Sequence, residues 1–218
     1  MSRSGPNSEL ARLPETLPIF PLPGTLLLPD GRLPLNIFEP RYMAMVRDAI
    51  AGARAIGMIQ PREAARDVGA ARVYGTGCAG RIVGFEETDD GRYLIELRGI
   101  ARFDVAEELP PHNGYRRVRA DYTRFRRDTQ DDETLVDRDR LLSTQGSYLD
   151  AAGIEGDWDV IEEADDAPLV TSLAMMCPFS APEKQALLEA ATLAERASTM
   201  TTLMEMALHA PDASDAHH

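Results

Sequence analysis

The chain has 218 residues and a formal net charge of −13, with 44% hydrophobic and 27% charged residues. It can form one large or two small globular domains, and so acidic a surface repels nucleic acid and anionic membranes. No apolar run of about 18 residues exists to span a membrane, and the polar N-terminus lacks a signal peptide's apolar segment, so we expect a cytoplasmic protein.

The stretch Leu17–Tyr42 is dense in proline and large apolar residues. Each proline fixes φ and removes a backbone donor, so no helix can run through it. The stretch therefore predicts short extended segments at Leu17–Phe20, Leu26–Leu28 and Leu33–Phe38. Asp30–Gly31 predicts a tight turn before the last of them.

An amphipathic helix is predicted over Arg41–Ala51, because apolar residues recur there with the spacing of one helical face. Pro40 suits its first turn and Gly52 its end. We expect Glu39 and Arg41 to cap and pin this helix rather than to contact a substrate.

Several antiparallel strands are expected next. The segments Ala55–Gln60, Gly75–Glu87 and Arg92–Arg98 are strand-like, and the pattern alternates again near Phe103 and over Arg117–Tyr122. Glycines in the second segment predict bulges or close backbone approach in a curled sheet. The whole predicts a barrel or a sandwich.

The spacing of apolar residues changes from strand-like to helix-like at Asp128–Glu133, an acidic stretch that predicts a linker. From Leu135 on, the spacing predicts helices. Leu135, Leu142 and Leu149 predict one apolar stripe. Short helices are predicted at Asp157–Ala164 and Pro168–Met176. Capping boxes at Ser180–Glu183 and Thr192–Glu195 begin two more predicted helices, Ala181–Ala190 and Leu193–His209. Residues 1–14 and 210–218 are expected to be disordered.

The opening stretch also resembles the signature of the Lon N-terminal domain, the substrate-recognition domain of the ATP-dependent Lon protease. The resemblance is carried by Phe20-Pro-Leu-Pro, Leu28-Pro and the run Leu33–Tyr42, with Asn36 where the family more often has His. Leu97–Phe103 and Pro178–Glu189 resemble later parts of the same domain. The motif residues, to which we assign a structural role, are Pro21, Pro23, Pro34, Phe38, Glu39, Pro40, Arg41 and Tyr42.

The resemblance implies an α+β fold: a PUA-like β-barrel over residues 15–126, followed by a C-terminal helical bundle over residues 134–209. Phe38, the last large apolar residue before the helix, is expected to plug the barrel.

The sequence offers little catalytic chemistry. It has no GxxxxGK[ST] phosphate loop, and Lys184, its only lysine, is expected on a solvated helix face. His112 reads as an exposed loop residue, and the acidic cluster Glu155–Asp166 lacks calcium-loop spacing. Cys78 and Cys177 lie in no CxxC or Cys/His cluster and predict two reduced, buried thiols. We therefore expect no catalytic residue, cofactor or metal.

The function implied by the resemblance is non-enzymatic recognition of unfolded or partly folded polypeptides. Methionines near the C-terminus could adapt to varied partners, although core packing explains them as well. A protease or a second copy of the chain is a possible further partner.

Two alternatives remain open. Arg116–Arg127 interleaves arginines with aromatic residues and could bind RNA, although we favour a strand face paired with nearby acids. The chain could also be an adaptor that docks on a protease.

Overall fold

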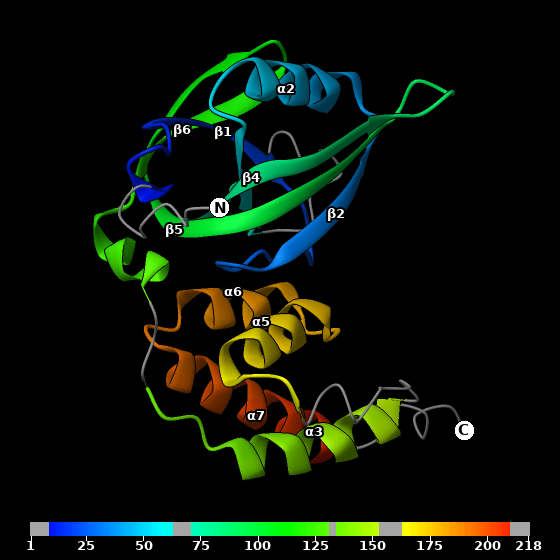
Figure 1. The fold of residues 1–218 in the computed structure, drawn as a ribbon, viewed down its shortest axis with the longest axis vertical. Helices are drawn as coiled ribbons and strands as arrows, with labels where there is room; N and C mark the ends of the chain where they lie inside the picture. The colour runs from blue at the N-terminus through cyan, green and yellow to red at the C-terminus, as the bar shows by residue number, and fades with distance from the viewer. Residues whose placement is uncertain (1–8, 63–70, 131–133, 153–162, 210–218) are drawn as a thin grey trace. The chain divides into compact units, whose positions relative to one another are not determined.

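The computed structural model describes residues 9–62, 71–130, 134–152 and 163–209 (Figure 1). It combines a six-stranded sheet with helices, which confirms the α+β class. The strands are β1 (Thr16–Pro21), β2 (Arg32–Ile37), β3 (Ala55–Ile59), β4 (Thr76–Glu87), β5 (Tyr93–His112) and β6 (Tyr115–Asp121). The helices are α2 (Pro40–Ala51), the 3-10 helix η1 (Thr123–Thr129), α3 (Arg138–Ala152), α5 (Asp166–Met176), α6 (Ala181–Glu189) and α7 (Leu193–His209).

Most predicted elements lie close to these bounds, but two strand predictions were wrong. Leu26–Leu28 is buried without being a strand, because a turn follows at once, in which the Gly31 amide donates to the Leu28 carbonyl at 3.0 Å. The expected separate strands at Arg92–Arg98 and near Phe103 form one strand, β5. The predicted helix Asp157–Ala164 lies largely outside the described residues.

Strand β5 organises the sheet, because along its 20 residues it pairs with β2, β4 and β6. From β4 the antiparallel pairing continues to β3, which runs parallel to β1, and β1 pairs with β6. The pairings therefore form a closed circuit through β5, β4, β3, β1 and β6. Strand β2 lies outside this circuit at the edge of the sheet.

The glycines of β4 have the two roles predicted for them. The β4–β5 register shifts next to Gly80 and Gly84, as bulges require. Gly77 lies opposite Phe103, and a Cβ on Gly77 would come within 2.7 Å of that ring. Phe103 is fully buried in a cluster with residues of the other strands of the circuit, including Leu17 and Val118.

The residue before Phe103 makes a buried ion pair. Arg102 binds Asp128 of η1 through its guanidinium, at 2.7 Å, and through its backbone amide, at 2.8 Å. Only 6% of the Arg102 side chain and 5% of the Asp128 side chain are exposed. The same guanidinium donates to the Leu188 carbonyl of α6 at 2.9 Å and lies 4.5 Å from the Phe125 ring centre. Arg102 therefore joins β5, η1 and α6.

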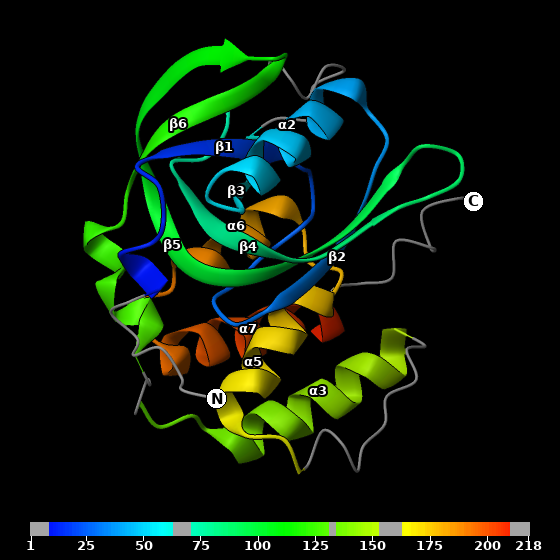
Figure 2. The same ribbon diagram turned by 45° about the horizontal axis from the view of Figure 1, so that its top comes forward.

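Helix α2 lies over strands β1 and β3 (Figure 2). Its apolar face is buried as predicted, with Tyr42, Met45, Val46 and Ala49 inside. On its polar side Asp48 accepts hydrogen bonds from Asn113 and Tyr115 in the β5–β6 hairpin, both at 2.9 Å. These bonds lower the pKa of Asp48, and burial raises the pKa of Tyr115 to about 12.

By its contacts the chain divides into two compact units, residues 1–131 with 171–189, and residues 132–170 with 190–218. The predicted domains at 15–126 and 134–209 stay a prediction; the units place residues 171–189 with the strands. In the first unit, α6 is bound to the strands by Gln60, which donates to the Ala181 carbonyl, and by Gln185, which donates to that of Thr76.

In the second unit α3 packs against α7. Leu141, Tyr148 and Leu149 are buried on α3, and Met200 and Met204 on α7. The predicted stripe was wrong at Leu135, which precedes α3 and is 93% exposed.

At each of the two predicted capping boxes, one of the two expected reciprocal hydrogen bonds is present at the helix start. The Glu183 carboxylate accepts a hydrogen bond from the Ser180 amide at 2.7 Å, and the Thr192 hydroxyl accepts one from the Glu195 amide at 3.1 Å. Among the described helices, none is long and apolar enough to cross a bilayer.

We predict that Asp128→Asn destabilises the protein by about 3–5 kcal/mol, because it leaves the Arg102 guanidinium buried without its counter-charge. Urea denaturation measures the change. Glu107→Gln, which removes one partner of the exposed Arg119–Glu107 pair, is the control and should have little effect. Equal midpoints for the two variants would contradict the structural role of Arg102.

Cys78 and Cys177 are free and buried, as predicted. Burial also raises the pKa of the Cys177 thiol to about 11, so little reactive thiolate forms at neutral pH. We therefore predict slow alkylation of the folded protein and two labelled thiols after denaturation, counted by mass spectrometry without reductant. A Cys78–Cys177 disulfide in protein taken from cells would refute this.

Candidate functional site

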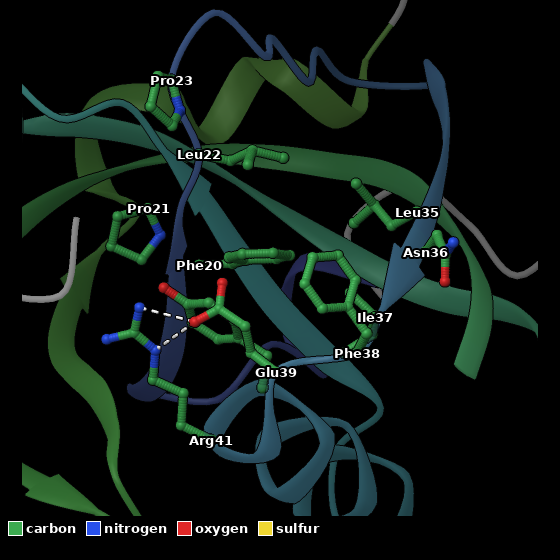
Figure 3. A pocket seen from close by; sticks show the side chains of 11 residues that line it. Phe20, Pro21, Leu22, Pro23, Leu35, Asn36, Ile37, Phe38, Glu39 and Arg41 are labelled. Carbon is green, nitrogen blue, oxygen red and sulfur yellow. Dashed lines mark hydrogen bonds and ion pairs between the residues drawn. The ribbon is translucent and has the colours of Figure 1, made fainter. Parts of the chain in front are cut away.

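Six of the eight motif residues line one pocket of about 380 Å³, here called the motif pocket (Figure 3). Pro34 and Pro40 are the two that do not line it. Pro34 lies in the edge strand β2, and Pro40 is at the start of α2, as predicted. The full lining comes from the ends of β1 and β2 and the start of α2: Phe20, Pro21, Leu22, Pro23, Leu35, Asn36, Ile37, Phe38, Glu39, Arg41 and Tyr42.

The base of the motif pocket is apolar and rigid. Phe20, Ile37 and Tyr42 are each at most 7% exposed, although they line the hollow. The rings of Phe20 and Tyr42 lie 4.2 Å apart between centres and fix each other's orientation. These side chains come from three elements, so the pocket forms only when β1, β2 and α2 pack together.

Phe38 is not the barrel plug that was expected. Its side chain is 62% exposed, whereas the preceding Ile37 is 2% exposed. The reason is strand alternation: Ile37 is the last residue of β2 and points inward, so its successor points out. Phe38 therefore presents an exposed aromatic ring at the mouth of the motif pocket.

Glu39 and Arg41 pair with each other across the turn into α2, as the dashed lines of Figure 3 show. The Arg41 Nε donates to the Glu39 carboxylate at 3.0 Å, and a second guanidinium nitrogen lies 2.9 Å from it. Glu39 occupies the N-cap position, but its side chain caps no backbone amide, so that part of the prediction was wrong. The Arg41 guanidinium also lies 4.7 Å from the Tyr42 ring centre.

The prolines leave the pocket with few backbone donors. Pro21 and Pro23 line one side and have no amide hydrogen. The amide of Leu22, between them, donates to the Ile59 carbonyl at 3.1 Å. Because Glu39 and Arg41 neutralise each other, the pocket suits an uncharged, apolar group. Its volume falls within the roughly 300–1,000 Å³ usual for binding pockets.

Three of the six arginines in the basic stretch Arg116–Arg127 pair with acids, which agrees in part with the paired strand face that we favoured. Arg116 binds Glu108 at 2.6 Å, Arg119 binds Glu15 at 3.0 Å, and Arg124 lies 3.5 Å from Asp104. Its aromatic residues are also occupied: the Tyr122 hydroxyl donates to the Pro14 carbonyl, and Phe125 is 4% exposed. The stretch offers no free aromatic face for base stacking.

Lys184 does not lie on a solvated helix face, which corrects the sequence prediction. It is 7% exposed, and its ammonium group donates to the Gly24 carbonyl at 2.7 Å. Burial lowers its pKa. The amine holds α6 to the Gly24 loop, and Lys184 is not among the residues that line the motif pocket.

His112 is exposed, as predicted, but it is the last residue of strand β5 and not a loop residue, and it lies 3.7 Å from the Asp48 carboxylate. Most of the acidic cluster Glu155–Asp166 lies outside the described residues. Within the part of the chain that the structure describes, no three His, Cys, Asp or Glu side chains are placed to hold a metal ion.

Sequence reasoning missed the pocket itself and its apolar lining residues Phe20, Leu22, Leu35 and Ile37. Phe20, Leu35 and Ile37 were predicted only to lie in short extended segments, and Leu22 was assigned to none of them. One sequence signal could have indicated the pocket. Prolines alternate with apolar residues at the ends of two predicted strands, and because proline interrupts sheet pairing, some of these apolar residues must remain outside the sheet.

Comparisons with known sequences match this resemblance. The family model of the ATP-dependent protease La (LON) substrate-binding domain matches residues 16–206. Lon protease 2 of Myxococcus xanthus is 31% identical over 143 residues, which are 65% of this chain and 15% of that protein. Lon protease 2 of Thermus thermophilus is 24% identical over 211 residues, which are 90% of this chain and 25% of that protein. The chain thus spans a quarter or less of these relatives.

Two solved structures are similar over most of their length. A Lon N-terminal domain protein from Xanthomonas campestris has a TM-score of 0.62 and 25% identity, with 86% of this chain and 97% of that chain covered. The N-terminal domain of Mycobacterium avium complex Lon protease has a TM-score of 0.57, with 87% and 98% covered. Its 15% identity shows a shared fold alone.

We predict that Phe38→Ala leaves stability nearly unchanged, within about 0.5 kcal/mol, because the ring is exposed. Its buried neighbour is the matched comparison: Ile37→Ala should cost about 2–5 kcal/mol. Chemical denaturation midpoints measure both. A loss of several kcal/mol in Phe38→Ala would restore the original view of Phe38 as a core residue.

Proposed function

The chain belongs to the family of ATP-dependent protease La (LON) substrate-binding domains, and we propose that its motif pocket binds apolar side chains of unfolded or partly folded polypeptides. The observation that carries the proposal is the exposed ring of Phe38 beside a preformed apolar pocket. An aromatic side chain left largely in water at a hollow is typical of a protein-binding position.

The edge of strand β2 is poorly suited to pairing with a client peptide, so we propose that the pocket binds client side chains instead. Strand β2 has a free edge, to which an extended peptide could in principle pair. Pro34, in the middle of β2, removes an amide donor from that strand and protects the edge. Binding then depends on apolar contact, which tolerates many client sequences because it is not directional.

We further propose that the chain binds without catalysing a reaction. Its only lysine, Lys184, is buried and held by the Gly24 carbonyl, so it is poorly placed as a general base. The free, buried thiols fit the proposed cytoplasmic location. The closed circuit of strand pairings supports the proposed PUA-like barrel. The pairing of Arg116, Arg119 and Arg124 with acids favours polypeptide over RNA as the partner.

We predict micromolar binding of fluorescently labelled, dephosphorylated casein, a permanently unfolded protein, without added nucleotide. A pocket of this size buries far less area than a standard protein interface, so tighter binding is not expected. Fluorescence anisotropy measures the affinity, which should change little between 50 and 200 mM salt because apolar burial drives it.

Phe38→Ala should weaken this binding about tenfold, which corresponds to about 1.4 kcal/mol. Met206→Ala is the matched control, because Met206 is 63% exposed and Phe38 is 62% exposed, but Met206 lies on α7. Equal losses in both variants, or no binding by the wild type at 100 μM (about a hundred times a micromolar Kd), would refute the proposal.

A further inference from the structure

The hairpin formed by β4 and β5 carries three further exposed apolar residues, of which Phe85 and Leu94 lie on opposite faces of the strands. Val83 is 43% exposed, Phe85 45% and Leu94 40%. The turn Thr88–Arg92 closes this hairpin, which projects away from the other strands in both ribbon views (Figure 1, Figure 2). Phe85 is held in place by an edge-to-face contact with Tyr93, with ring centres 5.1 Å apart.

The strand register connects this hairpin with the motif pocket. Leu94 of β5 lies directly opposite Asn36 of β2 on one side and Glu86 of β4 on the other. Directly opposed residues share one face of a sheet, and neighbouring strands are about 4.8 Å apart. Asn36 lines the motif pocket. The Leu94 backbone therefore lies one strand away from it, at about 5 Å, and the Glu86 backbone two strands away, at about 10 Å.

Three carboxylates at the end of the hairpin lack an ion-pair partner in the part of the chain that the structure describes. Glu86, Glu87 and Asp89 are exposed and have no ion pair within the described residues. By contrast, Asp90 pairs with Arg92, and Glu96 with Arg32. The projecting end of the hairpin therefore combines apolar side chains with three uncompensated negative charges.

Resting on the proposed function, we propose that the β4–β5 hairpin extends the motif pocket and selects client segments in which Lys or Arg flank apolar residues. The apolar residues of the client contact Phe38 and Leu94, and its cations lie against Glu86 on the same face, with Glu87 on the other face and Asp89 in the turn adding to the negative field at the end of the hairpin. An acidic client segment meets like charges at the same place and binds less well.

The expected selectivity is modest because the carboxylates are exposed. Exposed ion pairs add little each and are screened by salt, over a Debye length of about 8 Å at physiological ionic strength. We expect a basic client to bind about three to tenfold more tightly than an acidic one at 50 mM salt. The ratio should fall below about twofold at 500 mM salt.

Three labelled peptides test the selectivity, each with the same core of Phe, Leu and Val residues and with flanks of Lys, Gln or Glu. Anisotropy titrations compare the wild type with Glu86→Gln/Glu87→Gln at both salt concentrations. The control is Asp139→Asn/Asp150→Asn, which removes two exposed charges from α3 and so changes the net charge equally. We expect the hairpin variant to lose most of the preference for the Lys-flanked peptide, and the control to keep it.

The outcomes separate the two proposals. Equal affinity of the wild type for the Lys- and Glu-flanked peptides at 50 mM salt would overturn this inference and leave the proposed function standing. An equal loss of preference in both double variants would also overturn it, because net charge alone would then explain the effect. If the wild type bound none of the three peptides, the proposed function would fail and this inference with it.

Discussion

The first unit depends on the opposite directions in which strand β5 sends Arg102 and Phe103. Phe103 points into the circuit of strands, where Gly77 leaves room for its ring. Arg102 points to the other side, where Asp128 and the Leu188 carbonyl hold its buried guanidinium. A buried charge is tolerated only with such partners, so Arg102 helps to fix the positions of both η1 and α6 on the strands. Because successive side chains of a strand point to opposite faces, the buried core residue Phe103 and the ion-paired residue Arg102 are adjacent in the sequence.

The motif pocket has a related origin, because its proline-rich lining segments cannot complete a sheet. Pro21 and Pro23 end the pairing of β1, and Pro34 protects the edge of β2. Strand β1 ends at Pro21 and β2 at Ile37, α2 begins at Pro40, and residues from all three line the pocket. Prolines that interrupt strand pairing therefore leave a pocket with an apolar base and few backbone amide donors. Such a pocket is suited to binding apolar side chains.

Charge is distributed unevenly over the strands of this acidic chain. Along β6 and η1, three of the six arginines, Arg116, Arg119 and Arg124, pair with acids, so about half of the positive charge of the basic stretch is compensated. At the tip of the β4–β5 hairpin Asp90 pairs with Arg92, but Glu86, Glu87 and Asp89 have no such partner among the described residues. The net charge of −13 therefore indicates less about partners than the places where it is left uncompensated.

The sequence alone determined the local structure and the family. Proline spacing, period-2 and helical periodicity and two capping boxes predicted most strands and helices, because these signals depend on neighbouring residues. Three features needed the tertiary structure. Strand alternation exposes Phe38 and buries Ile37, and the end of β2 was not visible in the sequence. Lys184 is buried although its helical neighbours are polar, because the Gly24 loop, 160 residues earlier, accepts its hydrogen bond. The motif pocket exists because β1, β2 and α2 meet, and such meetings depend on long-range packing, which no local pattern encodes.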